Sequence, residues 1–437
     1  MEKIYSPSFF YSALKVYATD IFKRSFSVVE VNGENNIPKG ESVIFAPNHQ
    51  NALIDAMAIL ATTPSKVIFL ARADLFKKPT IAKALRALRI MPAYRIRDGI
   101  QNLKKNNDSF DQSVDTLLHK EFLCLMAEGG QDPHRRLRPL VKGMFRIAFS
   151  TQEQLPEKDF VKIVPVGIDY GNYDHTGHHL IVNYGKPITI EDYWKDYQEN
   201  APVTQNRLRD ELYSRMSELM MDVQSEKYYD TFYASSYLFN KEMLDELGLD
   251  DNETNRLIVR KKIVSLLSKI EEENESELAT LDDLCQKWNA SHKDVAFSAK
   301  VREDGCSFDF LLLLNIIYMV VFSPFLIYSL IFNGWPFALT KHLTKGTRGT
   351  GFEFSFVFGL ATLGFPVIYL IYTLIAAFIY PHWPFLLAFF CSLPVSFYFF
   401  IRYRWRWSYV KERFANITKP DIVSSIKSEL RRLFKKD

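Results

Sequence analysis

The most constraining feature of this chain is the absence of charge over two long stretches near its C-terminal end. No Asp, Glu, Lys or Arg occurs between Asp309 and Lys341, or between Glu353 and Arg402. A membrane-spanning helix needs about 20 apolar residues. The first stretch therefore has room for one span, and the second for two. We expect these spans at 310–333, 354–379 and 384–401. A buried core helix is the alternative, but uncharged runs this long and this rich in aromatic residues predict membrane insertion.

Basic residues flank these apolar stretches, in the loop at 341–348 and again at 402–413. Cytoplasmic loops carry an excess of Lys and Arg, so both groups are expected in the cytoplasm. Three full spans would then place the N-terminal part of the chain outside. We therefore expect 310–333, which contains Asn315 and Pro324, to be re-entrant or only partly inserted. The domain formed by the N-terminal part of the chain would then lie on the cytoplasmic face.

Composition narrows the class of protein further. The chain has 437 residues, enough for two or three units, and a formal net charge of +3, too small to indicate a nucleic-acid partner. Its four cysteines are scattered without C-x-x-C spacing, so they indicate neither a metal site nor a disulfide framework. The N-terminus has no long apolar core followed by a cleavage site, as a signal peptide would.

Upstream of about residue 300, short apolar runs alternate with helical stretches. Strands are expected at 25–31, 42–46, 66–71, 90–98, 122–127, 162–169 and 180–184. Alternation of this kind predicts an α/β fold: a layered domain with a mixed sheet flanked by helices and functional residues at strand ends. A helical connector and C-terminal transmembrane helices would follow it.

Residues 8–24 have the spacing of an amphipathic helix. Phe10, Leu14 and Tyr17 share one face, and Lys15 lies on the opposite side. Such a helix either packs on the domain core or lies in a membrane interface. The expected organisation is an N-terminal helix (1–24), an α/β domain (25–200), a helical connector (201–307), a membrane region (308–403) and a basic cytoplasmic tail (404–437).

A histidine and a carboxylate follow the strand expected at 42–46. His49 comes two residues after Pro47, and Asp55 lies at the start of the next predicted helix. A carboxylate beside a histidine fixes the imidazole tautomer and stabilises its protonated form, as a general base requires. The alternative is a helix-capping or surface histidine. The pair by itself indicates a possible base and nothing about its substrate.

Four blocks occur in order at expected strand ends: His49 with Asp55, Pro92 to Arg97, Glu128-Gly129 with Lys142-Gly143, and Val164-Pro165-Val166. Taken together, these blocks resemble the glycerolphosphate acyltransferase superfamily, the PlsC-like phospholipid acyltransferases. The likeness covers roughly residues 40–190.

The resemblance implies a role for each block. His49 would be the general base that takes a proton from a glycerol hydroxyl, with Asp55 as its orienting carboxylate. Arg95 would hold the phosphate of the acceptor, assisted by Arg97, because a guanidinium suits a phosphate dianion. The alternative for these arginines is a solvated strand end.

In the later blocks, Glu128 would help to bind and position the acceptor, and Gly129 would let backbone approach it. Lys142 would contact phosphate. Pro165 would shape the acyl-chain side of the pocket, and an ordinary strand-edge proline is its alternative.

Two departures from the family pattern stand out. Five residues separate His49 from Asp55, where the usual first block has four. This longer spacing resembles the fungal-type glycerol-3-phosphate acyltransferases, and an extra loop residue before the helix would restore the contact. The third block has Gly130-Gln131 where relatives carry Thr-Arg or a serine, which removes one expected donor to the acceptor. The arginines at 135–138 would compensate for it.

The resemblance implies an integral-membrane enzyme that moves a fatty acyl group from acyl-CoA or acyl-ACP to glycerol 3-phosphate or its 1-acyl derivative. No metal or bound cofactor is expected, because the acyl donor is a co-substrate. The expected partners are membrane lipids, the acyl donor (free or on its carrier protein) and the glycerol-phosphate acceptor. Two other classes are a membrane-anchored lipid hydrolase that activates water, and a non-catalytic lipid-binding relative.

Overall fold

The structure, a computed structural model, describes residues 4–6, 8–93, 103–173, 176–305, 307–347, 352–418 and 421–435. The chain forms two compact units. Unit 1 is Met1–Tyr173 with His179–Gln224, and unit 2 is Asp174–His178 with Ser225–Asp437.

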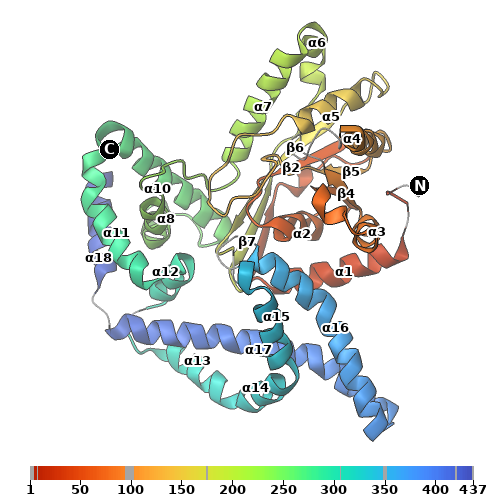
Figure 1. The fold of residues 1–437 in the computed structure, drawn as a ribbon. Helices are drawn as coiled ribbons and strands as arrows, with labels where there is room; N and C mark the ends of the chain where they lie inside the picture. The colour runs from red at the N-terminus through yellow and green to blue at the C-terminus, as the bar shows by residue number, and fades with distance from the viewer. Residues whose placement is uncertain are drawn as a thin grey trace. The chain divides into compact units, whose positions relative to one another are not determined.

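Unit 1 is built on an eight-stranded mixed sheet of order β1-β7-β6-β2-β5-β3-β4, with β8 beside β6 (Figure 1). The central strand β2 runs parallel to both of its neighbours, β5 and β6, whereas β7 and β8 run antiparallel to β6. The mixed sheet and the helices around it confirm the predicted fold class. The strands are β1 Val28–Asn32, β2 Val43–Pro47, β3 Val67–Arg72, β4 Ile90–Ala93, β5 Phe122–Cys124, β6 Lys162–Tyr170, β7 His179–Tyr184 and β8 Ile188–Thr189.

Helices cover both faces of this sheet, which explains why its strands are continuous apolar runs. Ile44 of β2 joins a core cluster with side chains of α4, α5 and α7. The next residue, Phe45, faces the other way and packs on Tyr184, whose hydroxyl bonds Thr62 of α2. The helices of unit 1 are α1 Phe9–Arg24, α2 Ala52–Thr62, α3 Pro79–Ala87, α4 Leu103–Leu118, α5 Gly143–Gln152, α6 Glu191–Glu199 and α7 Ala201–Ser217. Helix α7, which the sequence placed in the connector, thus contributes to the core of unit 1.

Helix α1 packs on α2 and buries Tyr11 and Phe22. Contrary to the sequence-based expectation, Lys15 lies on the packed side. Its ammonium donates to the carbonyl oxygens of Thr63 (3.1 Å) and Ser65 (2.6 Å) after the end of α2. Burial, with nearby cations, lowers the pKa of Lys15 to about 8. The half-buried lysine is stabilised in this place because the C-terminal carbonyls of a helix favour a cation.

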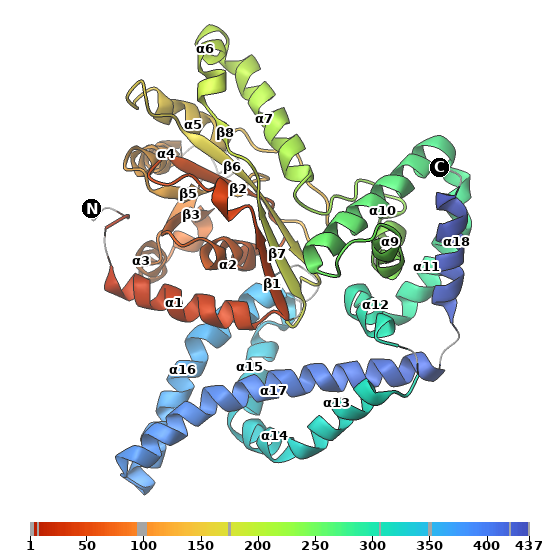
Figure 2. The same cartoon turned by 180° about the vertical axis from the view of Figure 1, so that it is seen from behind.

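Unit 2 begins with a bundle of charge-rich helices, as predicted for the connector. Helix α8 packs on α10 and α11, and the C-terminal helix α18 packs on α11 (Figure 2). Phe232, Leu257, Trp288 and Leu430 are buried in these four helices. The bundle helices are α8 Tyr229–Leu238, α9 Asn240–Glu246, α10 Glu253–Asn274, α11 Ala279–Ser291, α12 Val295–Glu303 and α18 Ile422–Phe434.

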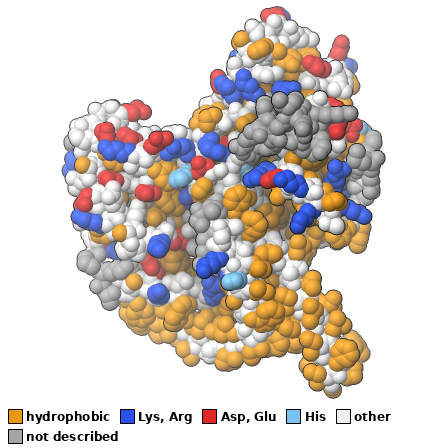
Figure 3. Space-filling view, viewed as in Figure 1, with side chains coloured by type: hydrophobic (Ala, Val, Ile, Leu, Met, Phe, Trp, Pro, Cys, Tyr) orange, Lys and Arg blue, Asp and Glu red, His pale blue; other side chains and the backbone are white. Residues whose placement is uncertain are grey.

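The other helices of unit 2 are apolar, and the space-filling view shows hydrophobic side chains gathered over them (Figure 3). In the described part of the chain, two helices are long and apolar enough to cross a membrane, α16 and α17. A third segment, Phe310–Val321 with Ser323–Leu343, passes the same test only as a pair bent by 54°, as in a broken span or a re-entrant loop. The helices are α13 Phe310–Val321, α14 Ser323–Ser329, α15 Trp335–Leu343, α16 Glu353–Ile379 and α17 Trp383–Thr418.

Two details differ from the sequence-based picture of this region. Helix α17 does not end near residue 401 but continues to Thr418, and beyond its apolar part Arg413 is fully buried and bonds Asp309 (2.5 Å). The chain past residue 404 is therefore mainly helical rather than an extended tail. The charge of Arg413 is paired with a carboxylate within unit 2.

A buried polar cluster joins three of the apolar helical segments. Asn333, in a π-helical turn at Leu330–Gly334, donates to the hydroxyls of Ser329 (3.1 Å) and Ser396 (2.9 Å). Its carbonyl accepts from the Tyr369 hydroxyl at 2.7 Å. Hydrogen bonds of this kind hold helices together where no hydrophobic driving force does so.

Candidate active site

The site lies where the central strands end. Strand β2 stops at Pro47, and the next residue, Asn48, ties the following loop to β6: its side chain donates to the Ile168 carbonyl (3.0 Å) and accepts from the Ile168 amide (2.7 Å). This paired contact continues the β2–β6 alignment one step past the strand. It places the loop, and His49 with it, at the carboxyl edge of the sheet, where ligands bind in open α/β folds.

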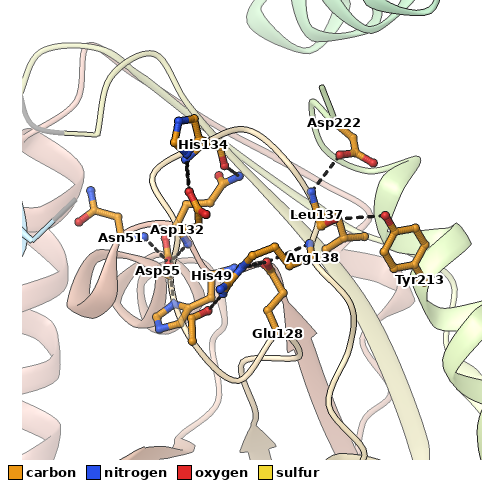
Figure 4. A network of polar contacts seen from close by, with 12 residues as sticks. His49, Asn51, Asp55, Glu128, Asp132, His134, Leu137, Arg138, Tyr213 and Asp222 are labelled. Carbon is orange, nitrogen blue, oxygen red and sulfur yellow. Dashed lines mark hydrogen bonds and ion pairs between the residues drawn. The ribbon is translucent and has the colours of Figure 1, made fainter. Parts of the chain in front are cut away.

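The structure brings His49 and Asp55 together in spite of the longer spacing. The His49 Nδ1 and Asp55 Oδ2 atoms are 2.9 Å apart, and the side chains are 17% and 1% exposed (Figure 4). Within the described residues, Nε2 of His49 makes no hydrogen bond. An imidazole whose Nδ1–H is held by a carboxylate presents the Nε2 lone pair to a substrate. This is the arrangement that a general base requires.

The loop before α2 folds around the Asp55 carboxylate, and this accommodates the extra residue. Oδ2 accepts hydrogen bonds from the backbone amides of Gln50 (2.8 Å) and Asn51 (2.7 Å) in addition to His49. The next residue, Ala52, has a φ of 30°, a region that residues other than glycine rarely adopt. The five intervening residues are thus taken up in a tight turn that has the carboxylate at its centre.

Glu128 supports the same loop from the segment that follows the neighbouring strand β5. Its Oε1 accepts from the His49 amide (2.8 Å), and its Oε2 accepts from the amide and Nε of Arg138 (both 3.1 Å). Burial raises the pKa of Glu128, although these hydrogen bonds and the Arg138 charge oppose the rise. Both oxygens are occupied by the protein itself, so Glu128 holds the His49 backbone in place.

Gly129 and Lys142 lie on the loop that follows β5. Gly129 has a φ of +64°, and an added Cβ would lie 2.7 Å from Cγ1 of Val141. The glycine is therefore required by the local backbone itself. Lys142 is exposed and precedes α5, and its ammonium contacts no described residue.

Pro165 lies inside the sheet, which rules out the strand-edge alternative. It pairs with Ala46 of β2, and its carbonyl accepts from the Gly185 amide at 2.9 Å. Strand β7 has already ended at Tyr184, so the N–H that proline lacks would face the loop that follows β7. An interior proline is tolerated there because no ladder bond is lost.

The predicted phosphate ligands Arg95 and Arg97 lie outside the described residues. Strand β4, which precedes them, runs parallel to β3 and ends at Ala93.

Several residues of the site carried no signal in the sequence. The Tyr170 hydroxyl donates to Asp55 Oδ1 (2.7 Å), and Gln131 accepts from the Ala52 amide (3.0 Å). Tyr170 ends the long, mainly apolar strand β6, and a tyrosine there is typical of an ordinary core residue, so nothing in the pattern distinguishes it. Only the pairing of β6 with β2 brings it to the carboxylate.

The arginines at 135–138 were expected to replace the hydrogen-bond donor to the acceptor that the third block lacks. Contrary to this expectation, each of them is already bonded within the protein. Arg135 is buried, donates to the Tyr170 carbonyl (2.6 Å) and lies over the Tyr173 ring. Arg136 donates to the Val223 carbonyl (3.2 Å), and Arg138 is bonded to Glu128. Their charges serve to hold backbone around the site.

A second histidine–carboxylate pair lies nearby. His134 Nδ1 is 2.6 Å from Asp132 Oδ1, but the two side chains are 57% and 37% exposed (Figure 4). His49 is the better candidate base, because its carboxylate is buried and held by three further donors. In the described ranges, no group of three or more His, Cys, Asp or Glu side chains could hold a metal ion.

Two comparisons with known proteins found similarities to this chain. Residues 28–169 match the family model described as Acyltransferase. No curated protein matches the chain. Among solved structures, the chain is similar to the 1-acyl-sn-glycerophosphate (LPA) acyltransferase PlsC from Thermotoga maritima, with 19% sequence identity, a TM-score of 0.35 and coverage of 47% of this chain and 79% of that one. Residues 28–169, which carry His49, Asp55, Glu128 and Pro165, are thus the part of the chain that is similar to the acyltransferase family.

Proposed function

We propose that this protein is a membrane O-acyltransferase of phospholipid biosynthesis. It moves a fatty acyl group from acyl-CoA or acyl-ACP to glycerol 3-phosphate or 1-acyl-glycerol 3-phosphate. The observation that supports this function best is the 2.9 Å contact between His49 and a buried Asp55, with Nε2 of the imidazole open.

The reaction follows from that geometry. His49 Nε2 takes the proton of the acceptor hydroxyl while the oxygen attacks the thioester carbonyl. The C–S bond then breaks, and the leaving thiolate takes the proton from the imidazolium. General-base catalysis of this kind contributes about 10²–10⁴-fold. Asp55 stabilises the imidazolium that exists between these two proton transfers.

The remaining residues of the site would bind the acceptor, hold His49 in place or shape the pocket. Arg95 and Arg97 would hold the acceptor phosphate, and Lys142 would add a cation, since its ammonium contacts no described residue. Glu128 would act by fixing the His49 backbone, because both of its oxygens are already bonded. Pro165 would shape the acyl side of the pocket.

An assay of washed membranes tests this function. Membranes containing the protein are offered labelled glycerol 3-phosphate and labelled 1-acyl-glycerol 3-phosphate in turn, each with acyl-CoA and with acyl-ACP. We expect acylated product from one acceptor. Release of free fatty acid without acylated product would instead indicate the hydrolase.

Four alanine variants sharpen the assignment. His49→Ala and Asp55→Ala should abolish transfer. His119→Ala should retain it, because His119 is an exposed histidine with its own carboxylate, Asp115, at 3.4 Å. His134→Ala should also retain activity. If His49→Ala remains active, the catalytic assignment is wrong.

We further propose that the catalytic domain lies on the cytoplasmic face and that the bent segment 310–343 is re-entrant. The 54° bend in this segment supports the second point. Single cysteines placed at the exposed positions Asn200 and Lys345 test both points through a membrane-impermeant label. The two positions should react from the same side, and labelling from opposite sides would refute the arrangement.

A further inference from the structure

Tyr170 lies at the site but takes no part in the proton transfers just described. It is the last residue of β6 and is fully buried. Its hydroxyl donates to Asp55 Oδ1 at 2.7 Å. Burial, together with the Asp55 charge, raises the pKa of this hydroxyl well above its usual range. Tyr170 therefore stays protonated at any working pH and always donates.

The surroundings of Tyr170 keep it in one place. Its ring stacks against Phe26 and meets Tyr173 edge to face, with centroids 6.2 and 5.6 Å away. Its carbonyl accepts from the buried guanidinium of Arg135 at 2.6 Å. A side chain packed and bonded in this way gives its hydroxyl a fixed position.

The two oxygens of Asp55 have different partners. Oδ2 accepts from His49 and from the amides of Gln50 and Asn51. Among the described residues, the Tyr170 hydroxyl is the donor to Oδ1. Rotation of the carboxylate about its Cβ–Cγ bond is therefore fixed at one oxygen by the loop and at the other by Tyr170.

We infer that Tyr170 is a positioning residue of the proposed acyl transfer: its hydroxyl fixes the plane of the Asp55 carboxylate and withdraws part of its charge, which sets how strongly Asp55 stabilises the His49 imidazolium. This inference rests on the proposed function. One further titratable group lies within range of the Asp55 charge, the Cys124 thiol on β5. Burial and the Asp55 charge raise the pKa of this thiol, so the thiol stays neutral.

Tyr170→Phe removes the hydroxyl and keeps the ring. We expect kcat to fall about tenfold, because the plane of the Asp55 carboxylate is no longer fixed and the loss of orientation of His49 outweighs its stronger attraction to the carboxylate. KM for the acceptor should not change, because the hydroxyl does not reach the acceptor. The acid limb of kcat/KM should move to higher pH, because an Asp55 charge no longer shared with Tyr170 stabilises the imidazolium more strongly.

Two further variants separate this role from a structural one. Tyr184→Phe is the matched control: Tyr184 is also a buried tyrosine of the sheet, but its hydroxyl bonds Thr62 and Thr63. It should leave the acid limb and KM unchanged. Site-specific 3-fluorotyrosine at position 170 has nearly the shape of tyrosine and a stronger donor. It should move the acid limb to lower pH, and this test does not depend on the folding of Tyr170→Phe.

The outcomes are distinguishable. A wild-type protein without acyl transfer, or an active His49→Ala, refutes the proposed function. An active wild type and an inactive His49→Ala, with Tyr170→Phe and the fluorinated protein both showing the wild-type acid limb, refute the role of Tyr170 alone. Equal losses of kcat in Tyr170→Phe and Tyr184→Phe with unmoved acid limbs also refute it, because they indicate general loosening of the sheet.

Discussion

The Asp55→Asn substitution tests the central contact in a quantitative way. The substituted amide has one oxygen and one NH2 group of nearly the same shape as the carboxylate. The amides of Gln50 and Asn51 both point at the Oδ2 position. An NH2 group there would leave two donors unsatisfied, at a cost of about 1–3 kcal/mol each. The oxygen should therefore take this position, still accept from His49 Nδ1–H and keep the catalytic tautomer.

What the variant loses is charge. Two unit charges about 4 Å apart in an effective dielectric of roughly 20 attract by about 4 kcal/mol. Since His49 is 17% exposed, solvent screens part of this, and about 3–4 kcal/mol is a fair range. That corresponds to a fall in kcat of about 10²–10³-fold. The acid limb of kcat/KM should move to lower pH, because the imidazolium loses its stabilising neighbour.

The assay is steady-state acyl transfer in washed membranes across pH 5–9, with the amount of folded protein measured in parallel. Asp115→Asn is the matched control, since Asp115 faces the exposed His119 at 3.4 Å and should not affect transfer. A loss in Asp55→Asn of less than about threefold, or an unmoved acid limb, would show that the Asp55 charge does not support the base.

Three further predictions concern stability. Gly129→Ala should destabilise unit 1 by about 1–3 kcal/mol in denaturant unfolding, because its φ of +64° strains any side chain, whereas Gly143→Ala, with open space around it, should not. The raised pKa of the Glu128 carboxyl means that the folded state binds this proton more tightly than the unfolded state does. The Tm of the wild type should therefore drop as the pH rises above about 4.5 and then level off. In Glu128→Gln, which has no carboxyl at this position, Tm should not show this drop. Asn333→Ala should lower the stability of the apolar helices in detergent by about 1–2 kcal/mol, and Leu339→Ala, on an exposed position of α15, should have a smaller effect.

The sequence was informative wherever the signal is local. Short apolar runs bounded by turn residues marked the strands of the sheet except the two-residue β8, and the lack of charge after Glu353 marked α16 and the apolar part of α17. The order of the blocks in the chain placed His49 and Glu128 at strand ends. Each of these inferences depends on hydrophobic periodicity or chain order, which neighbouring residues determine.

The sequence was uninformative where the hydrogen-bond partners of a side chain lie on a distant segment. Lys15 was assigned to solvent from helical periodicity, but it caps α2 some 50 positions further along the chain. Glu128 was expected to bind and position the acceptor, and the sequence did not show that its oxygens accept from the His49 amide and from Arg138. Helical periodicity and motif position carry no information on contacts of this range.

The His49–Asp55 pair shows where the division lies. The sequence by itself determined that a histidine and a carboxylate occur together after a buried strand, and that long apolar helices follow. Only the tertiary structure decided that the pair is in contact. The turn around Asp55 is stabilised by backbone amides of its own loop and by the hydroxyl of Tyr170, which comes from a strand more than a hundred residues away. Hydrogen bonds between segments that far apart exist only once β6 has paired with β2, so no local pattern can reveal them.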